Sequence, residues 1–325
     1  MNDTTKHPPL GVRLLYSLIK QPDLQALSPE ELAEHSAAQN HKVESPLMRL
    51  VTGFPNRATQ IEWHQLALAD REQRVRVYRG STATRPPDGL PLVIHVHGGG
   101  FVGTAAQCDW INSHLAAQLS AVVVSVEHRL LGPETPLSAA VDDCWDTLQH
   151  VLGDASRWGI SASNVAIVGE SAGGTIAALC TLRARQWGLP LRAQVLVNPC
   201  TDVTASAFDY PSMAEHSNTP TLNLDRLELM CRLAVPTGTG PRAVSPLYAD
   251  DLSELPPALV AIPTLDPLAD QGRRYAEKMG EAQTSVQVAE YRRAGHAFVS
   301  MPGLVPQAKA ARRDITAFLR KRLSE

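Results

Sequence analysis

A serine lies among glycines in the stretch IVGESAGGTIAA, residues 167–178. Gly169, Ser171 and Gly173 match the pattern G-x-S-x-G, which is short enough to occur by chance. Here, however, the pattern separates an apolar run from a helical pattern, so Ser171 falls on a strand-to-helix turn, the setting of a nucleophile elbow. Glycine loses more backbone entropy on folding than other residues, so we interpret its repeated use as the requirement of a sharp, strained turn that exposes one hydroxyl.

A serine hydroxyl needs a base to take its proton and hydrogen-bond donors for the oxyanion that forms on attack. The stretch HVHGGGFVG, residues 95–103, follows another strand candidate. Consecutive glycines let backbone N–H groups turn inward, and we predict Gly99, Gly100 and Ala172 as the donors. Gly98 is an equal candidate if the loop is shifted by one residue. A nucleotide-phosphate loop is excluded because no Lys-Ser or Lys-Thr pair follows the glycines.

Two C-terminal segments supply an acid and a base in the expected chain order of serine, acid and histidine. Asp266 follows the apolar run ALVAIP, and His296 follows SVQVAEY, so both lie at the carboxyl ends of predicted strands. Ligands of open α/β sheets bind at that edge. We predict that His296 takes and returns the proton of Ser171, while Asp266 fixes the imidazole tautomer and stabilises the imidazolium.

Other titratable residues fit these roles less well. His128 follows a strand candidate but precedes the serine in the chain. His95 is expected within the sheet, and His97 is expected to orient the glycine loop. Glu170, next to the nucleophile, points away from it if the strand alternates. We interpret Glu170 as a local anchor, with tuning of the site as the alternative.

The elements that must position these side chains are strands alternating with helices, which predict a doubly wound, mostly parallel α/β sheet. Strand candidates lie at 61–68, 73–79, 91–97, 121–127, 164–170, 193–198, 258–263 and 285–291. Helical patterns lie at 137–152, 171–188, 269–282 and 306–323. The later strands are almost continuously apolar, which predicts that helices cover both faces of the sheet.

Two segments interrupt this alternation. Residues 1–55 are helical in pattern, and residues 204–240 combine a loop-like stretch with a helical one. We predict that these two segments form a helical cap across one end of the sheet, although ordinary extensions would give the same pattern. The catalytic core is then expected to comprise residues 56–203 and 241–325.

Composition limits the class of protein. The chain has 325 residues, of which 44% are hydrophobic and 19% charged, as expected for a packed globular core. Its formal net charge of −3 provides no basic excess for binding nucleic acid. The five cysteines are far apart and form no C-x-x-C pair, so we expect buried, reduced thiols and no metal site.

The sequence also shows neither a membrane-spanning pattern nor a secretory signal pattern. No apolar run approaches the ~20 residues that a membrane span needs. The apolar stretch near the N-terminus is broken by Arg13 and lacks a small-residue cleavage site. We therefore expect a cytoplasmic protein without a membrane span.

The motifs HGGGF, GESAGG, LDPLAD and GHAF together resemble the hormone-sensitive-lipase-like branch of the α/β-hydrolases, which includes bacterial carboxylesterases and arylacetamide deacetylases. The resemblance runs from about residue 73 to the C-terminus. It implies an eight-stranded sheet, a cap made of the N-terminal helices and an insertion after the sixth strand, and hydrolysis of small-molecule esters without a cofactor. Carried over by position, it gives the same triad of Ser171, Asp266 and His296. Homodimers occur in this family.

The sequence departs from the family's pattern beside the site. AAQCDW, with Cys108 and Trp110, stands where the family usually carries a serine, a histidine or tyrosine, and an aspartate. GHAF replaces Ile-His-Gly-Phe around the histidine. These changes are expected to reshape the acyl pocket, for which the candidate substrate-binding residues are Phe101, Glu170 and Trp110.

The predicted activity is that of a serine carboxylesterase acting through an acyl-enzyme. A short-to-medium acyl preference is expected because the cap segments are modest in size and aromatic residues make up 5% of the chain. A deacetylase or amidase of small aryl amides is the alternative from the same fold. A catalytically inactive ligand-binding protein is the alternative from another class, although such proteins typically lose the serine or the histidine.

Overall fold

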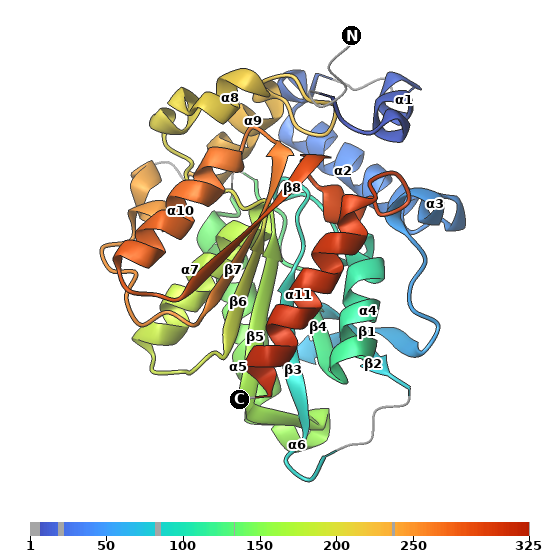
Figure 1. The fold of residues 1–325 in the computed structure, drawn as a ribbon, viewed down its shortest axis with the longest axis vertical. Helices are drawn as coiled ribbons and strands as arrows, with labels where there is room; N and C mark the ends of the chain where they lie inside the picture. The colour runs from blue at the N-terminus through green and yellow to red at the C-terminus, as the bar shows by residue number, and fades with distance from the viewer. Residues whose placement is uncertain (1–6, 19–22, 82–85, 133, 236–237, 325) are drawn as a thin grey trace.

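The computed structural model describes residues 7–18, 23–81, 86–132, 134–235 and 238–324. A central eight-stranded sheet has helices on both faces (Figure 1). In chain order the strands are β1 Thr59–Ala67, β2 Glu72–Gly80, β3 Leu90–Val96, β4 Val122–Val126, β5 Ile160–Glu170, β6 Ala193–Val197, β7 Ala258–Leu265 and β8 Val286–Gly295. Their order across the sheet is β1-β2-β4-β3-β5-β6-β7-β8.

The sheet is mostly parallel, as predicted. Strands β3 to β8 pair in parallel, whereas β1 and β2 form an antiparallel hairpin whose second strand runs antiparallel to β4. Each predicted strand is present with ends shifted by a few residues. Because parallel strands end at one edge of the sheet, the residues that follow β5, β7 and β8 gather there.

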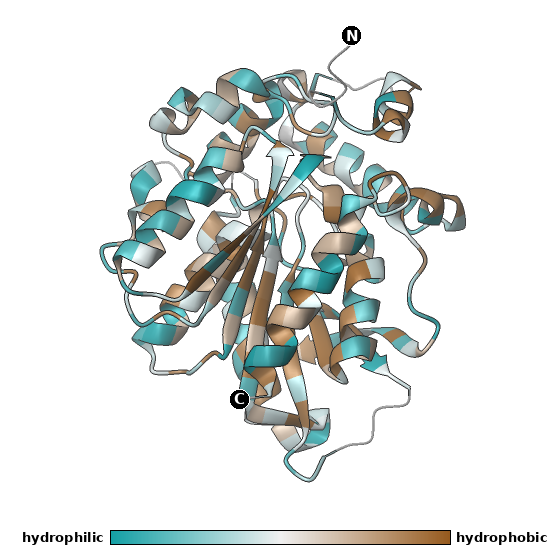
Figure 2. Ribbon diagram, viewed as in Figure 1, coloured by the Kyte–Doolittle hydropathy of each residue, from teal (hydrophilic) through white to brown (hydrophobic). Residues whose placement is uncertain are grey.

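Helices bury both faces of the sheet. Helices α5 Leu137–Gly153, α7 Ala172–Gln186 and α10 Ala269–Glu281 cover one face, and α4 Asp109–Leu119 and α11 Gln307–Leu323 cover the other. Successive residues of β3 belong to opposite apolar clusters, since Leu92 and Ile94 pack on the first face and Val93 on the second. Figure 2 shows the apolar strands between helices whose outer surfaces are hydrophilic.

Helix α4 was not predicted, because buried polar residues interrupt its apolar pattern. Asn112 and Ser113 are both fully buried. The Ser113 hydroxyl accepts a hydrogen bond from the Asn56 N–H, and the Ser113 carbonyl accepts one from the Thr59 hydroxyl. Ser113 therefore holds the start of β1 against the helix, a contact between segments far apart in sequence.

The two segments that interrupt the alternation gather at one end of the molecule. The first contains α1 Leu10–Leu18, the 3-10 turn η2 Leu24–Ala26, α2 Pro29–Val43 and α3 Arg49–Thr52, and the second contains α8 Pro211–Glu215 and α9 Leu224–Ala234. The arrowheads of β7 and β8 point toward these helices in Figure 1, and η2 packs against α9. The short helix α8 lies in a stretch that the sequence pattern had indicated as a loop.

The cysteines, the last helix and the apolar character of the helices bear on the expectations from composition. The cysteines are unpaired; four are buried, and Cys231 is half-buried. The buried residues of α11 lie on one stripe, and Arg313 and Arg320 are exposed on its opposite face. Of the helices in the described ranges, none combines the length and apolar character needed to cross a bilayer.

Candidate active site

Ser171 lies on the turn between β5 and α7. Its backbone angles, φ 54° and ψ −118°, belong to a region that costs a non-glycine residue about 1–3 kcal/mol. A Cβ added to Gly169 would lie 2.3 Å from the Gly173 carbonyl oxygen, and a Cβ on Gly173 would lie 2.3 Å from the Val96 carbonyl oxygen. Side chains at these positions would push the strand and the helix apart. The predicted sharp, strained and glycine-dependent turn is confirmed.

The structure brings together the serine, histidine and aspartate predicted from chain order. The Oγ atom of Ser171 lies 2.7 Å from Nε2 of His296, and Nδ1 of that histidine lies 2.8 Å from Oδ2 of Asp266. A carboxylate can only accept, so Nδ1–H donates to it and leaves Nε2 to accept the serine O–H. The three residues are buried, with exposed fractions of 3%, 5% and 0%. This hydrogen-bonded row of Ser171, His296 and Asp266 has the geometry needed to move the serine proton to the imidazole.

Strand register makes the histidine and the aspartate neighbours. Leu265 at the end of β7 pairs with Gly295 at the end of β8, and the next residue of each strand belongs to the row. Oδ1 of Asp266 accepts a hydrogen bond of 2.9 Å from the Leu268 N–H, which holds the carboxylate in place. Ala297 has left-handed backbone angles, with φ 57°, a conformation that favours glycine.

The glycine loop after β3 lies against the nucleophile. A Cβ on Gly98 would lie 3.3 Å from Cβ of Ser171. Gly99 and Gly100 have positive φ values of 103° and 66°. Within the described ranges, no hydrogen bond to another described residue uses the N–H groups of these three glycines or of Ala172. All four groups therefore stay available to an oxyanion, and the choice among the glycines stays a prediction.

Two stacked histidines lie beside this loop, and one of them is hydrogen-bonded to it. Nδ1–H of His97 donates to the Gly98 carbonyl at 2.8 Å, so His97 orients the loop as predicted. Its ring stacks on that of His128, with centroids 4.2 Å apart. Burial lowers the pKa of His97 to about 4 and that of His128 to about 3, so both rings are neutral near pH 7.

The two segments that interrupt the alternation, 1–55 and 204–240, each contact the glycine loop. The Asn40 side chain of α2 donates a 3.1 Å hydrogen bond to the Val102 carbonyl. From α9, Met230 lies close enough to Gly100 that a Cβ there would be 3.3 Å from the sulfur atom. The sequence offered no signal for either contact, because each joins segments that are distant along the chain.

The candidate substrate-binding residues occupy three different surroundings. Phe101 is fully buried in the apolar cluster that contains α5 and α7. Trp110 of α4 packs closely against Gly53, and its ring lies under the Arg312 guanidinium at 4.9 Å. Glu170 is buried directly before the nucleophile. Contact of these side chains with a substrate stays a prediction.

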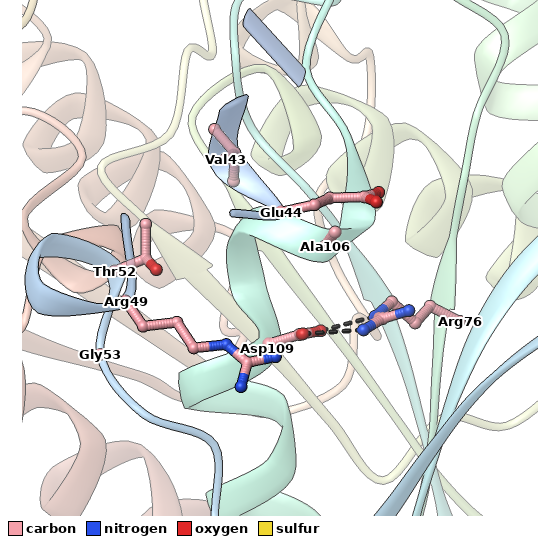
Figure 3. A pocket seen from close by; sticks show the side chains of 8 residues that line it. All are labelled: Val43, Glu44, Arg49, Thr52, Gly53, Arg76, Ala106 and Asp109. Atoms are coloured by element: carbon pink, nitrogen blue, oxygen red, sulfur yellow. Dashed lines mark hydrogen bonds and ion pairs between the residues drawn. The ribbon is translucent and has the colours of Figure 1, made fainter. Parts of the chain in front are cut away.

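A small polar cavity of about 110 Å³ lies where the N-terminal helices meet the core. It is lined by Val43, Glu44, Arg49, Thr52, Gly53, Arg76, Ala106 and Asp109 (Figure 3). Arg76 donates to both carboxylate oxygens of Asp109, and the Tyr78 hydroxyl donates to one of them. The two cations of the lining are matched by two carboxylates, and no lining residue belongs to the triad or the glycine loop.

The fold and this site define an α/β-hydrolase, and comparison with known proteins agrees. The chain matches a family described as having the α/β-hydrolase fold over residues 93–300. It is 36% identical over 226 residues to the esterase LipI of Mycobacterium tuberculosis, covering 68% of this chain and 69% of that protein. It is 33% identical over 253 residues to an arylesterase of Saccharolobus solfataricus, covering 73% and 76% of the two chains.

Solved structures extend the similarity to nearly the whole chain. A hyperthermophilic esterase from the archaeon Pyrobaculum calidifontis superposes with a TM-score of 0.82 at 28% identity, covering 95% of this chain and 96% of that one. The chain belongs to the α/β-hydrolase family, in the hormone-sensitive-lipase-like branch that its motifs resemble.

Proposed function

We propose that this protein is a serine carboxylesterase that cleaves short-to-medium acyl esters of small molecules through an acyl-enzyme intermediate. Its relatives include proteins named esterase, carboxylesterase and arylesterase, and the chain is a carboxylic ester hydrolase of the α/β-hydrolase type. The observation that carries the finer proposal is the buried hydrogen-bonded row from Ser171 through His296 to Asp266.

In the first step, Oγ of Ser171 attacks the ester carbonyl carbon while its proton passes to Nε2 of His296. The carbonyl oxygen becomes an oxyanion, for which Gly99, Gly100 and Ala172 are the proposed N–H donors. The tetrahedral intermediate then expels the alkoxide, which takes the proton from Nε2 and leaves as the alcohol. Asp266 keeps the ring in the required tautomer and offsets its positive charge.

In the second step, water repeats the attack on the acyl-enzyme. Nε2 of His296 takes a proton from the water as its oxygen bonds to the acyl carbon. Collapse of the second intermediate breaks the bond to Oγ of Ser171, which recovers its proton, and releases the carboxylic acid. The helix N-terminus of α7 lies directly after Ser171, and its dipole favours the negative charge that develops in both steps.

We further propose that residues 1–55 and 204–240 form a cap above this site, with residues 56–203 and 241–325 as the catalytic core. The contacts of Asn40 and Met230 with the glycine loop support this division. The segments are short, so the cap is expected to enclose a small acyl group. Turnover of p-nitrophenyl butyrate should therefore exceed that of an emulsified long-chain triglyceride, and the reverse order would contradict the proposed acyl range.

Replacement of the nucleophile tests the mechanism. Ser171→Ala should lower kcat for p-nitrophenyl butyrate by about 10⁴-fold or more while the circular-dichroism spectrum and unfolding midpoint stay close to those of the wild type. Intact-mass analysis should find one organophosphate adduct on the wild type and none on the variant. A variant with wild-type turnover, or an adduct that persists without Ser171, would exclude this serine as the nucleophile.

A further inference from the structure

Glu170 is a buried carboxylate that the mechanism above leaves without a role. It ends β5, directly before Ser171, with an exposed fraction of 4%. Its Oε2 atom accepts a 2.7 Å hydrogen bond from the Ser300 hydroxyl and lies 3.9 Å from the Cys108 sulfur. Its Oε1 atom is buried without a hydrogen-bond partner among the described residues. Burying a carboxylate with only one of its oxygens hydrogen-bonded destabilises the folded state, so we expect Glu170 to have a functional role.

The Ser300 contact ties together the two halves of the active site. Ser300 lies on the short turn Phe298–Ser300, which follows His296. Its bond to Glu170 spans 130 residues of sequence. The bond therefore joins the loop that carries the base to the turn that carries the nucleophile, next to the point where the proton moves.

A positive charge on His296 acts on Glu170. Burial raises the pKa of Glu170, whereas the Ser300 hydroxyl, a positive charge on His296 and the Cys108 thiol lower it. Burial also raises the pKa of the Cys108 thiol well above its ordinary range, so this neighbour stays neutral. Asp109 and Glu127 also act on that thiol and raise its pKa further. A carboxylate in this position is favoured when the imidazole becomes charged.

We propose that Glu170 is a positioning residue for His296, one that braces the histidine loop through Ser300 and stabilises the imidazolium formed during attack. This inference rests on the proposed serine mechanism. Asp266 acts by a direct hydrogen bond to the ring, whereas Glu170 acts through space and through the loop. Its effect on turnover is therefore smaller than that of the triad aspartate.

Two substitutions separate the charge of Glu170 from its hydrogen bond. Glu170→Gln keeps an oxygen that can accept from Ser300 but removes the charge. Ser300→Ala removes the hydrogen bond but keeps the charge. The carboxylate favours the protonated, inactive imidazole of the free enzyme, so loss of the charge moves the acid limb of the kcat/KM profile to lower pH. Loss of the hydrogen bond alone lowers kcat and moves that limb much less.

The experiment measures kcat and kcat/KM of the full-length enzyme for p-nitrophenyl butyrate between pH 5 and pH 9. Glu170→Gln should lower kcat on the order of 10-fold and shift the acid limb to lower pH. Glu170→Asp, which restores a charge at a shorter reach, should return the limb toward the wild-type position. An unshifted limb in Glu170→Gln, or an equal shift in Ser300→Ala, would overturn the proposal.

Two controls keep the result interpretable. If Glu170→Gln does not fold, as judged by circular dichroism, Glu170→Ala takes its place: its acid limb must lie at lower pH than that of Ser300→Ala, and equal limbs overturn the proposal. Ser171→Ala is assayed in the same series. Activity in that variant refutes the serine mechanism itself, whereas an inactive Ser171→Ala beside an unshifted Glu170→Gln refutes the role of Glu170 alone.

Discussion

The edge of the sheet that carries the triad and the N-terminal helices above it are held in different ways. At the edge, backbone groups of β3, β5 and α7 approach so closely that a Cβ on Gly173 would lie 2.3 Å from a carbonyl oxygen. In the N-terminal segment, by contrast, large apolar side chains stay in solvent. Exposed fractions between 55% and 84% are found for Leu10, Leu14, Leu18, Leu47, Leu50 and Phe54.

This difference implies that substitutions in the core and in the N-terminal segment affect the reaction in different ways. The core holds the reacting groups by strand register, close backbone packing and buried hydrogen bonds, so a small change there affects the fold and the chemistry together. The N-terminal segment contacts the glycine loop through the side-chain hydrogen bond of Asn40, and the polar cavity of Figure 3 lies between this segment and the core. Changes there should alter the rate modestly and leave the fold intact.

The largest effect is expected where the core is tightest. Gly173→Ala places a methyl group 2.3 Å from the Val96 carbonyl oxygen and 2.4 Å from that of His97. Neither backbone group can move without separating β3 from α7, so we expect a loss of about 3 kcal/mol in the free energy of unfolding. Esterase activity should fall by at least about 100-fold, because an oxyanion donor and the nucleophile shift together. Urea unfolding and p-nitrophenyl butyrate turnover measure both quantities.

A matched glycine gives the control. A Cβ on Gly153, at the end of α5, would have no atom within 4 Å. Gly153→Ala should therefore change the free energy of unfolding by less than about 1 kcal/mol. If the two variants were equally stable, close backbone packing would not be the reason for glycine at position 173.

How much of this organisation can be predicted from sequence depends on the distance over which each contact acts. The strands, the nucleophile turn and the chain order of the triad follow from local patterns, and the parallel sheet then brings Asp266 and His296 together. Contacts such as Glu170 with Ser300 depend on packing between remote segments. Helix α4 was not predicted for the same reason, because its buried Ser113 is explained only by its hydrogen bonds to Asn56 and Thr59, which lie more than 50 residues away in the sequence.

An intermediate effect is expected from acid, which acts on the core through its buried histidines. Burial lowers the pKa of His95 and His128 to about 3 and that of His97 to about 4. The unfolded chain takes up protons below pH ~6.5 that the folded core cannot, so stability is fully present above that pH and is lost on acidification. The slope should reach up to about 1.4 kcal/mol per pH unit for each histidine.

Urea unfolding at pH 7.5, 6.5 and 5.5 measures this slope. His128→Asn removes one proton-binding group and retains an amide that can donate to the Arg129 carbonyl, as Nδ1 of His128 does. The variant should show a shallower loss of stability toward pH 5.5 than the wild type. An equal pH dependence of the free energy of unfolding in both proteins would mean that His128 does not resist protonation in the folded state.

The smallest effect is expected from the contact between the N-terminal segment and the site. Asn40→Ala removes the 3.1 Å hydrogen bond to the Val102 carbonyl, at a cost of about 1 kcal/mol or less in the free energy of unfolding. Because that loop carries the proposed oxyanion donors, kcat should fall by a few-fold while KM for p-nitrophenyl butyrate changes less. His41→Ala, at an exposed position on the same helix, should leave both constants unchanged. A rise in KM at constant kcat would instead mean that α2 contributes to substrate binding and that the core holds the oxyanion loop without it.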